Sequence, residues 1–188
     1  MQRHLFLTGA ESAVCAQMLR EALGARMMEA GGFVTLREES GLSLIPAAGA
    51  AGADGFEPLR FLTRSAAGEH TDNEVFRSDG ARLLREAPYY PFAVLDFTGG
   101  FDLLIPQYRD ALAELLNAEL PLLAVLLSPR EAEQLRRSLG LGEKYTLYGE
   151  QIRRALKADP DSLLLDCSGL ARLRARRVLD SWVQEYVR

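Results

Sequence analysis

The sequence has little of what marks several common classes of protein. Its 188 residues include two cysteines, Cys15 and Cys167, which are too few for a disulfide framework. No apolar run reaches about 18 residues, so no membrane-spanning helix is expected, and the first residues show no signal-peptide pattern. The formal net charge of −4 argues against a general nucleic-acid-binding surface, which would be basic. Together these absences predict a cytoplasmic protein with neither a membrane nor a nucleic acid as its partner.

The composition is that of a folded globular chain. Hydrophobic residues make up 48% of the sequence and charged residues 26%, unlike the composition of a disordered segment. The length suits one domain of ordinary size that buries a sizeable core. Because no internal repeat or second domain is visible, we expect residues 1–188 to form a single domain.

Short apolar runs alternate with amphipathic segments along most of the chain. The apolar runs predict buried parallel strands at His4–Leu7, Phe92–Asp96, Pro121–Leu127 and Leu163–Asp166. Apolar residues at helical spacing predict helices that start near Ser12, Asn73, Ile105, Ser128 and Glu150, and a last helix at the C-terminus. Strands that alternate with helices predict an α/β fold with a mainly parallel sheet.

Three further strands have no long helix between them, which predicts an antiparallel meander inserted around residues 31–62. We expect them at Gly31–Leu36, Leu42–Ile45 and Phe56–Leu62, with a small-residue loop at Pro46–Gly55. Residues 63–72 are polar and are expected to form a surface loop. A short strand is also expected at Tyr145–Tyr148.

The stretch from Arg3 to Leu23 predicts a strand, a tight turn at Gly9 and an amphipathic helix that Ser12 can cap. This is the layout of a phosphate-binding loop, whose pattern G-x-x-x-x-G-K-[ST] would start at Gly9. The second glycine, the lysine and the hydroxyl of that pattern then fall on Val14, Cys15 and Ala16. Gly9 alone also fits an ordinary turn between a strand and a helix.

A second stretch places Asp96 at the end of a buried strand. In a P-loop protein an aspartate at this position holds magnesium. An aspartate at a strand end also commonly satisfies loop amides, so the metal-binding and structural interpretations both stay open. We expect Asp102 to cap the entry of the next helix.

With both stretches placed, the chain resembles the small P-loop nucleoside triphosphatases of the cancer-related nucleoside triphosphatase type. The likeness covers at least residues 3–127. It rests on the order and spacing of HLFLTG, GGFVTLRE, NEVFRSDGARLLREA and FAVLDFTGGFDLLIPQYRDALAELLNAELPLLAVLL. The resemblance implies a P-loop α/β fold, with Mg²⁺ and ATP or GTP as cofactors if the nucleotide site is retained. It also implies a vestigial phosphate loop formed by Gly9, Ala10, Glu11, Ser12, Ala13, Val14, Cys15 and Ala16, and Asp96 as a metal ligand.

The departures from the family lie where its chemistry would be. The family has glycines at the positions of Ser12 and Val14, lysine at Cys15 and a hydroxyl residue at Ala16, and its water-activating glutamate falls on Phe97. Lysine neutralises phosphate charge and the hydroxyl ligates Mg²⁺; cysteine and alanine supply neither. We therefore expect a degenerate homologue without efficient hydrolysis and without catalytic residues, which acts as a binding or scaffold protein.

Two alternatives remain. An active ATP- or GTP-hydrolysing enzyme with non-standard ligands would use arginines of the later helices, such as Arg130, Arg136 and Arg137, and Asp102 in place of the glutamate. A binding module for another anionic small molecule would use the carboxyl ends of the strands, where ligands of open α/β sheets bind. That cleft would be bounded by Gly9–Ala16, Asp96–Asp102 and Ser128–Arg130. An unknown protein partner is compatible with each hypothesis.

Some residues have a plainer explanation than a functional one. Cys15 lies on the apolar stripe of its helix, which favours a buried small side chain over a reactive thiol at a helix N-terminus. The arginines at 172, 174, 176 and 177 favour a solvated helix face over an anion site. His4 and His70 lie in separate segments and do not suggest a catalytic pair.

Overall fold

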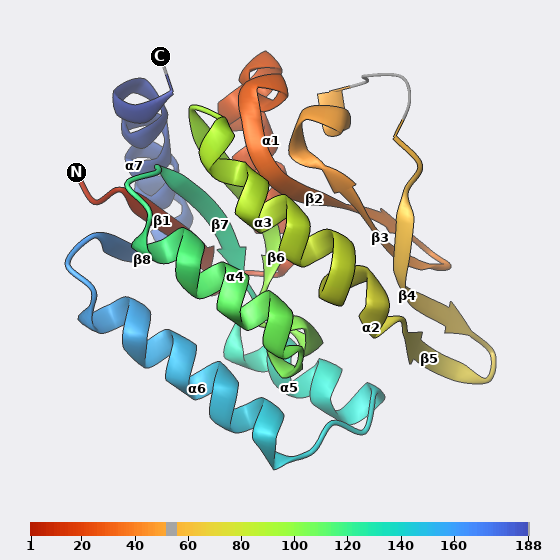
Figure 1. Ribbon diagram of the computed structural model, residues 1–188. Helices are drawn as coiled ribbons and strands as arrows, with labels where there is room; N and C mark the ends of the chain where they lie inside the picture. Colours follow the sequence, from red (N-terminus) through yellow and green to blue (C-terminus); the bar gives the residue numbers. More distant parts are fainter. Residues whose placement is uncertain (52–55, 188) are drawn as a thin grey trace.

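The computed structural model describes residues 1–51 and 56–187, and these residues form one eight-stranded sheet with helices on both faces (Figure 1). The strand order is β5-β4-β3-β2-β6-β7-β1-β8. The strands are β1 His4–Thr8, β2 Ala30–Glu38, β3 Gly41–Pro46, β4 Leu59–Ser65, β5 Gly68–Thr71, β6 Phe92–Thr98, β7 Leu122–Leu126 and β8 Ser162–Asp166. Because β2, β6, β7, β1 and β8 pair in parallel, the predicted mainly parallel α/β sheet is confirmed.

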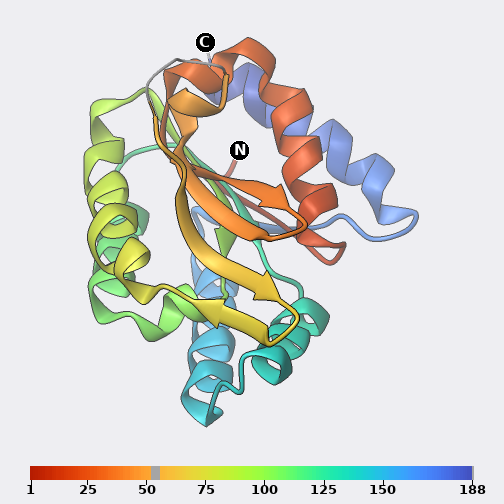
Figure 2. The same ribbon diagram turned by 90° about the vertical axis from the view of Figure 1, so that its right-hand side faces the viewer.

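The helices cover the sheet in two layers, which Figure 2 shows on opposite sides of the strands. They are α1 Ser12–Leu23, α2 Asn73–Val75, α3 Ala81–Glu86, α4 Pro106–Asn117, α5 Pro129–Ser138, α6 Glu143–Ala158 and α7 Ala171–Tyr186. One core cluster joins α1 and α7 to one face, and a second joins α3, α4 and α6 to the other. In the part of the chain that the structure describes, every helix is too short or too polar to cross a bilayer.

The antiparallel part of the sheet is larger than the sequence indicates. Strands β2, β3 and β4 form the expected meander, but β4 runs on to Ser65 and pairs with β5. The surface loop predicted for residues 63–72 is therefore wrong: the tract is a polar hairpin at the sheet edge, where charged side chains discourage pairing with other chains. Of the predicted loop at Pro46–Gly55, Ala47–Ala51 is a 3₁₀ turn, and residues 52–55 lie outside the described residues.

Two helical segments differ from expectation in detail. The helix predicted from Asn73 contains a π-helical stretch, Phe76–Gly80, between α2 and α3. The strand predicted at Tyr145–Tyr148 is wrong, because these residues belong to α6. Tyr145, Tyr148, Ile152 and Leu156 recur at helical spacing and face the core, and this longer repeat outweighs the strand preference of the aromatic residues.

The parallel strands bring several connecting loops to one edge of the sheet. Strands β1, β6, β7 and β8 run in the same direction and are neighbours, so their carboxyl ends lie together. The turn after β1, the turn after β6 and the start of α5 after β7 therefore meet at this edge, where ligands of open α/β sheets bind.

Candidate functional site

The turn after β1 is short and depends on Gly9. Gly9 has φ +87°, and a Cβ atom at this position would lie 2.1 Å from Asp166 Oδ1 at the end of β8. Only glycine fits both the backbone conformation and the space. The turn consists of Gly9–Glu11, and α1 begins directly afterwards at Ser12. The predicted strand, tight turn and helix are thus present in that order.

The residues that would form the second half of a phosphate loop belong to helix α1. The amides of Val14 and Cys15 both donate to the carbonyl of Glu11, at 2.9 and 3.1 Å. Their N–H groups are used within the chain, so they do not point toward a bound phosphate as loop amides would. Glu11 is the N-cap, without a side-chain bond, so the expectation that Ser12 caps α1 is wrong by one residue.

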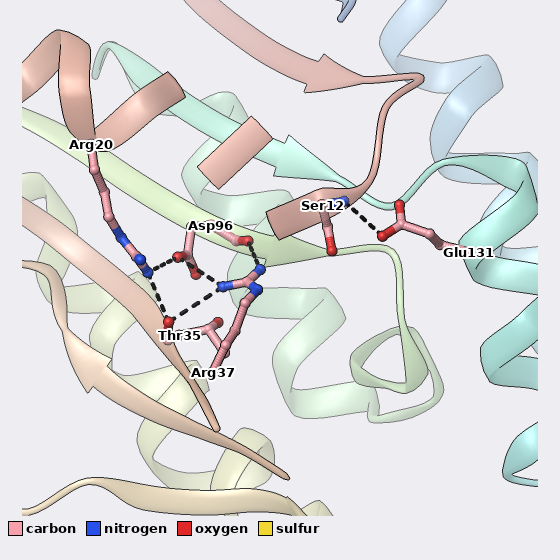
Figure 3. Close-up of polar contacts among 6 residues, drawn as sticks. All are labelled: Ser12, Arg20, Thr35, Arg37, Asp96 and Glu131. Atoms are coloured by element: carbon pink, nitrogen blue, oxygen red, sulfur yellow. Dashed lines mark hydrogen bonds and ion pairs between the residues drawn. The ribbon is translucent and has the colours of Figure 1, made fainter. Parts of the chain in front are cut away.

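The N-terminus of α1 is instead bonded to a carboxylate of the chain itself. The Ser12 amide donates to Glu131 Oε1 at 2.7 Å (Figure 3). The other oxygen of Glu131 accepts from the amide and hydroxyl of Ser128, at 3.2 and 3.0 Å, in the predicted capping box of α5. A helix N-terminus favours negative charge, and here Glu131 supplies that charge to two helices at once.

Replacing Glu131 with alanine is expected to lower the free energy of unfolding by about 1–2 kcal/mol, since a lost helix cap costs that much and the Ser12 amide loses its partner as well. Urea unfolding at neutral pH measures the change. Glu133→Ala on the same helix is the matched control, because its ion pairs are at the surface and should contribute little to stability. Equal losses in the two variants would contradict a double capping role.

Asp96 lies at the centre of an ion-pair network. Its carboxylate is fully buried, and Oδ2 accepts from Arg20 Nη2 at 2.6 Å and from Arg37 Nη1 at 3.3 Å (Figure 3). Arg37 Nη2 also donates to the Asp96 carbonyl at 3.2 Å. Both guanidinium groups donate to the Thr35 carbonyl, at 2.7 and 3.3 Å. The network joins α1 to the neighbouring strands β2 and β6.

These surroundings do not fit the magnesium that the family resemblance implies. Mg²⁺ requires closely spaced oxygen ligands, whereas two positively charged groups occupy one side of Asp96 and Ala16 offers no hydroxyl. Within the described residues there is no group of three or more His, Cys, Asp or Glu side chains that could hold a metal ion. Asp96 Oδ1 is one of several buried side-chain atoms that have no hydrogen-bond partner within the described residues. Metal binding by Asp96 stays a prediction, and the ion pairs give the residue a structural role without it.

The side chain of Phe97 packs on the face of β6 opposite to that of Asp96, because successive side chains of a strand point to alternate faces. Its ring centroid lies 5.3, 6.1 and 6.3 Å from those of Phe61, Phe76 and Phe101, and its side chain is buried. The position where the family resemblance places a water-activating glutamate is therefore part of an aromatic cluster. No base can act on water from Phe97.

Asp102 is buried in the turn that follows β6. Its Oδ2 accepts from the Gly99 amide at 3.2 Å, and burial raises the pKa of Asp102 to about 7. The expectation that Asp102 caps the next helix is wrong, because Ile105 is the N-cap of α4 and makes no side-chain bond. The Tyr145 hydroxyl donates to the Gly99 carbonyl at 3.1 Å and ties α6 to the same turn.

A shallow cleft of about 280 Å³ opens beside the start of α1. Glu11, Ser12 and Ala13 line it together with Phe97, so two of the three predicted segments contribute to it; the third, Ser128–Arg130, does not, and its neighbour Glu131 lines the cleft instead. The lining also includes two arginines that the sequence pattern does not single out, Arg37 and Arg64. Both already have carboxylate partners, Asp96 and Glu69, so the cleft has no excess of positive charge.

Two of the arginines that an active enzyme with non-standard ligands would use are paired within their own helix. Arg136 and Arg137 both pair with Glu133, at 2.7 Å each, and they lower the pKa of that carboxyl group to about 2. The chain's two lysines, Lys144 and Lys157, both belong to α6. Cys15, at the lysine position of the pattern, is fully buried, and the neighbouring Cys167 thiol together with burial raises the pKa of its thiol.

Comparison with known proteins supports the fold and goes no further. The whole chain is similar to the crystal structure of THEP1 from the hyperthermophile Aquifex aeolicus, with a TM-score of 0.64, 12% sequence identity, and coverage of 98% of this chain and 99% of that one. This chain has a P-loop nucleoside-triphosphatase-like fold. No family model and no curated protein matches the sequence. At 12% identity the likeness concerns the arrangement of strands and helices, so the chemistry of the site has to be argued from its own residues.

The residues that define this site were only partly visible in the sequence. The capping-box spacing of Ser128 and Glu131 was recognisable, but the second contact of Glu131, with Ser12, joins positions 119 residues apart. Arg20 and Arg37 lie 76 and 59 residues from Asp96. In the local sequence, each is only an arginine that comes directly after buried residues of a helix or a strand. Such an arginine usually points into water, so neither position indicates an ion pair.

Proposed function

We propose that this protein is a P-loop-fold protein that does not hydrolyse nucleotides efficiently and acts in the cytoplasm as a binding or scaffold protein. The observation that carries the proposal is the 2.7 Å bond from the Ser12 amide to Glu131. The chain's own carboxylate lies where a phosphate loop presents its helix N-terminus to phosphate. A nucleotide would have to displace Glu131 and break the capping box of α5.

The charges of the cleft support the same proposal. Its carboxylates are Glu11 and Glu131, and its guanidinium groups are Arg37 and Arg64, which already pair with Asp96 and Glu69. A triphosphate is a polyanion whose transfer needs preorganised positive charge. This cleft offers no lysine, no hydroxyl at Ala16 and at least as many negative as positive groups, so it lacks the electrostatic stabilisation of the transition state.

Phosphate release from ATP and GTP tests the proposal. The purified protein with Mg²⁺ is expected to release no more phosphate than buffer does, because the charged groups that stabilise phosphoryl transfer are absent together. Magnesium-dependent turnover that disappears in a folded Asp96→Asn variant would contradict it and would favour an active enzyme with non-standard ligands. Circular dichroism of the variant supplies the folding control.

A second candidate function is the binding of another anionic small molecule in the cleft beside α1. The observation in its favour is that Arg37 and Arg64 both line this cleft while keeping part of their side chains in water, 22% and 45% respectively. Thermal shift with ATP, GTP and small mono-anions separates the candidates. A ligand at 100 times its Kd stabilises the folded state by about 2.7 kcal/mol, so even modest affinity is measurable.

A further inference from the structure

A second hollow lies on the other side of α5 from the cleft beside α1. It is enclosed between α5, α6 and the ends of β6 and β7, and its volume is about 260 Å³. Ligand pockets usually measure about 300–1,000 Å³, and this hollow lies just below that range, so only a small ligand would fit. Most of its wall is apolar and comes from Leu126, Pro129, Ala132 and Ile152.

Arg153 lines this hollow and differs from the other cations around it. Its guanidinium donates to the Leu127 carbonyl, and among the described residues it forms no ion pair with any Asp or Glu side chain. By contrast, Arg136 in the same wall is paired with Glu133. Glu150 lies at the rim but is exposed and does not pair with Arg153. Burial lowers the pKa of Arg153, so its charge is partly desolvated.

A half-buried charge without a counter-ion is unfavourable, and a ligand that supplies the opposite charge removes this cost. The apolar wall beside Arg153 would cover a hydrocarbon body at the same time. We propose that the hollow between α5 and α6 binds a small molecule with one acidic group on an apolar body, and that Arg153 binds the acidic group. The inference is independent of what the cleft beside α1 binds.

Isothermal titration calorimetry of the whole chain tests the site with octanoate, octanol and acetate. Octanoate should bind saturably and about tenfold or more tighter than octanol, because a hydrogen bond to a charged group is worth that much. Acetate, which lacks the apolar body, should bind much more weakly. Octyl phosphate is compared with octanoate to distinguish a phosphate from a carboxylate. The one that binds more tightly carries the acidic group that the site prefers.

Two variants test which parts of the hollow contact the acidic group and the apolar body of the ligand. Arg153→Gln should remove the preference for octanoate over octanol, and the matched control Arg154→Gln, on an exposed neighbour in α6, should keep it. Ala132→Leu keeps the charge but fills the hollow, so it should abolish binding, and it remains informative if Arg153→Gln does not fold. Absence of saturable octanoate binding, equal affinity for octanoate and octanol, or full binding by both variants would overturn the proposal.

Discussion

Replacing Asp96 with asparagine is expected to lower the free energy of unfolding by about 3 kcal/mol, the lower end of the range for breaking a buried ion pair. The loss is large because Asp96 is fully buried while two guanidinium groups would stay behind without their counter-charge. It falls at the lower end because the side chains of Arg20 and Arg37 are 41% and 22% exposed to water.

The sign of this change distinguishes the two roles considered for Asp96. A carboxylate kept mainly as a metal ligand is an unfavourable buried charge in metal-free buffer, so its neutralisation would raise stability. An ion-pair partner gives a decrease in the same buffer. Urea unfolding with a chelator present measures the change, and Asp180→Asn, which breaks a surface pair with Arg176, is a control expected to stay under about 1 kcal/mol. An increase in the stability of Asp96→Asn would refute the structural role.

A double-mutant cycle between Asp96 and each arginine resolves the network further. The cycle isolates the pairwise term, which for contacting groups is about 0.5–3 kcal/mol. Arg20, at 2.6 Å from Oδ2, should couple to Asp96 more strongly than Arg37 does at 3.3 Å.

The second large effect concerns Asp102 and pH. Burial raises the pKa of Asp102 to about 7, whereas an unfolded chain has an aspartate pKa of about 3.9. Between these values the folded protein holds a proton that the unfolded chain has released. The stability contributed by protonated Asp102 is therefore complete below about pH 4 and is lost as the pH rises through about 7.

Asp102→Asn cannot ionise, so it should escape this loss. At pH 8 the variant is expected to be more stable than the wild type by up to about 4 kcal/mol, since each unit of pKa difference corresponds to about 1.4 kcal/mol. At pH 4 the two proteins should differ little, because the amide oxygen can still accept from the Gly99 amide. Urea unfolding at both pH values measures the difference. Other titrating groups, His4 among them, act equally in both proteins and cancel, so a difference that is the same at both pH values would contradict the buried, proton-binding role.

Much of the fold follows from patterns within single segments. The apolar runs that became β1, β6, β7 and β8 are continuous because both faces of a central parallel strand are buried. Edge strand β5, Gly68–Thr71, is short and polar because one side of it meets water, so its sequence resembles a loop. Tyr145–Tyr148 alone is compatible with a strand, because four residues are too few to show the helical repeat of α6.

The site could be predicted only to the extent that it depends on local sequence. The absence of lysine at Cys15 and of glutamate at Phe97 was visible directly. The contacts actually present at the site, Ser12 with Glu131 and Arg20 with Asp96, join α1 to α5 and α1 to β6. They depend on packing between segments that are distant in the sequence. Sequence spacing says nothing about which arginine reaches Asp96, because long side chains from several elements have the same reach.

The double contact of Glu131 has a consequence for how this chain could change over evolutionary time. A route toward phosphate binding would have to remove a carboxylate that holds the ends of two helices, and to place a lysine at Cys15, where the side chain is fully buried. Each step lowers stability before any phosphate is bound. Neither substitution on its own completes a phosphate site. The present packing opposes each step of such a change.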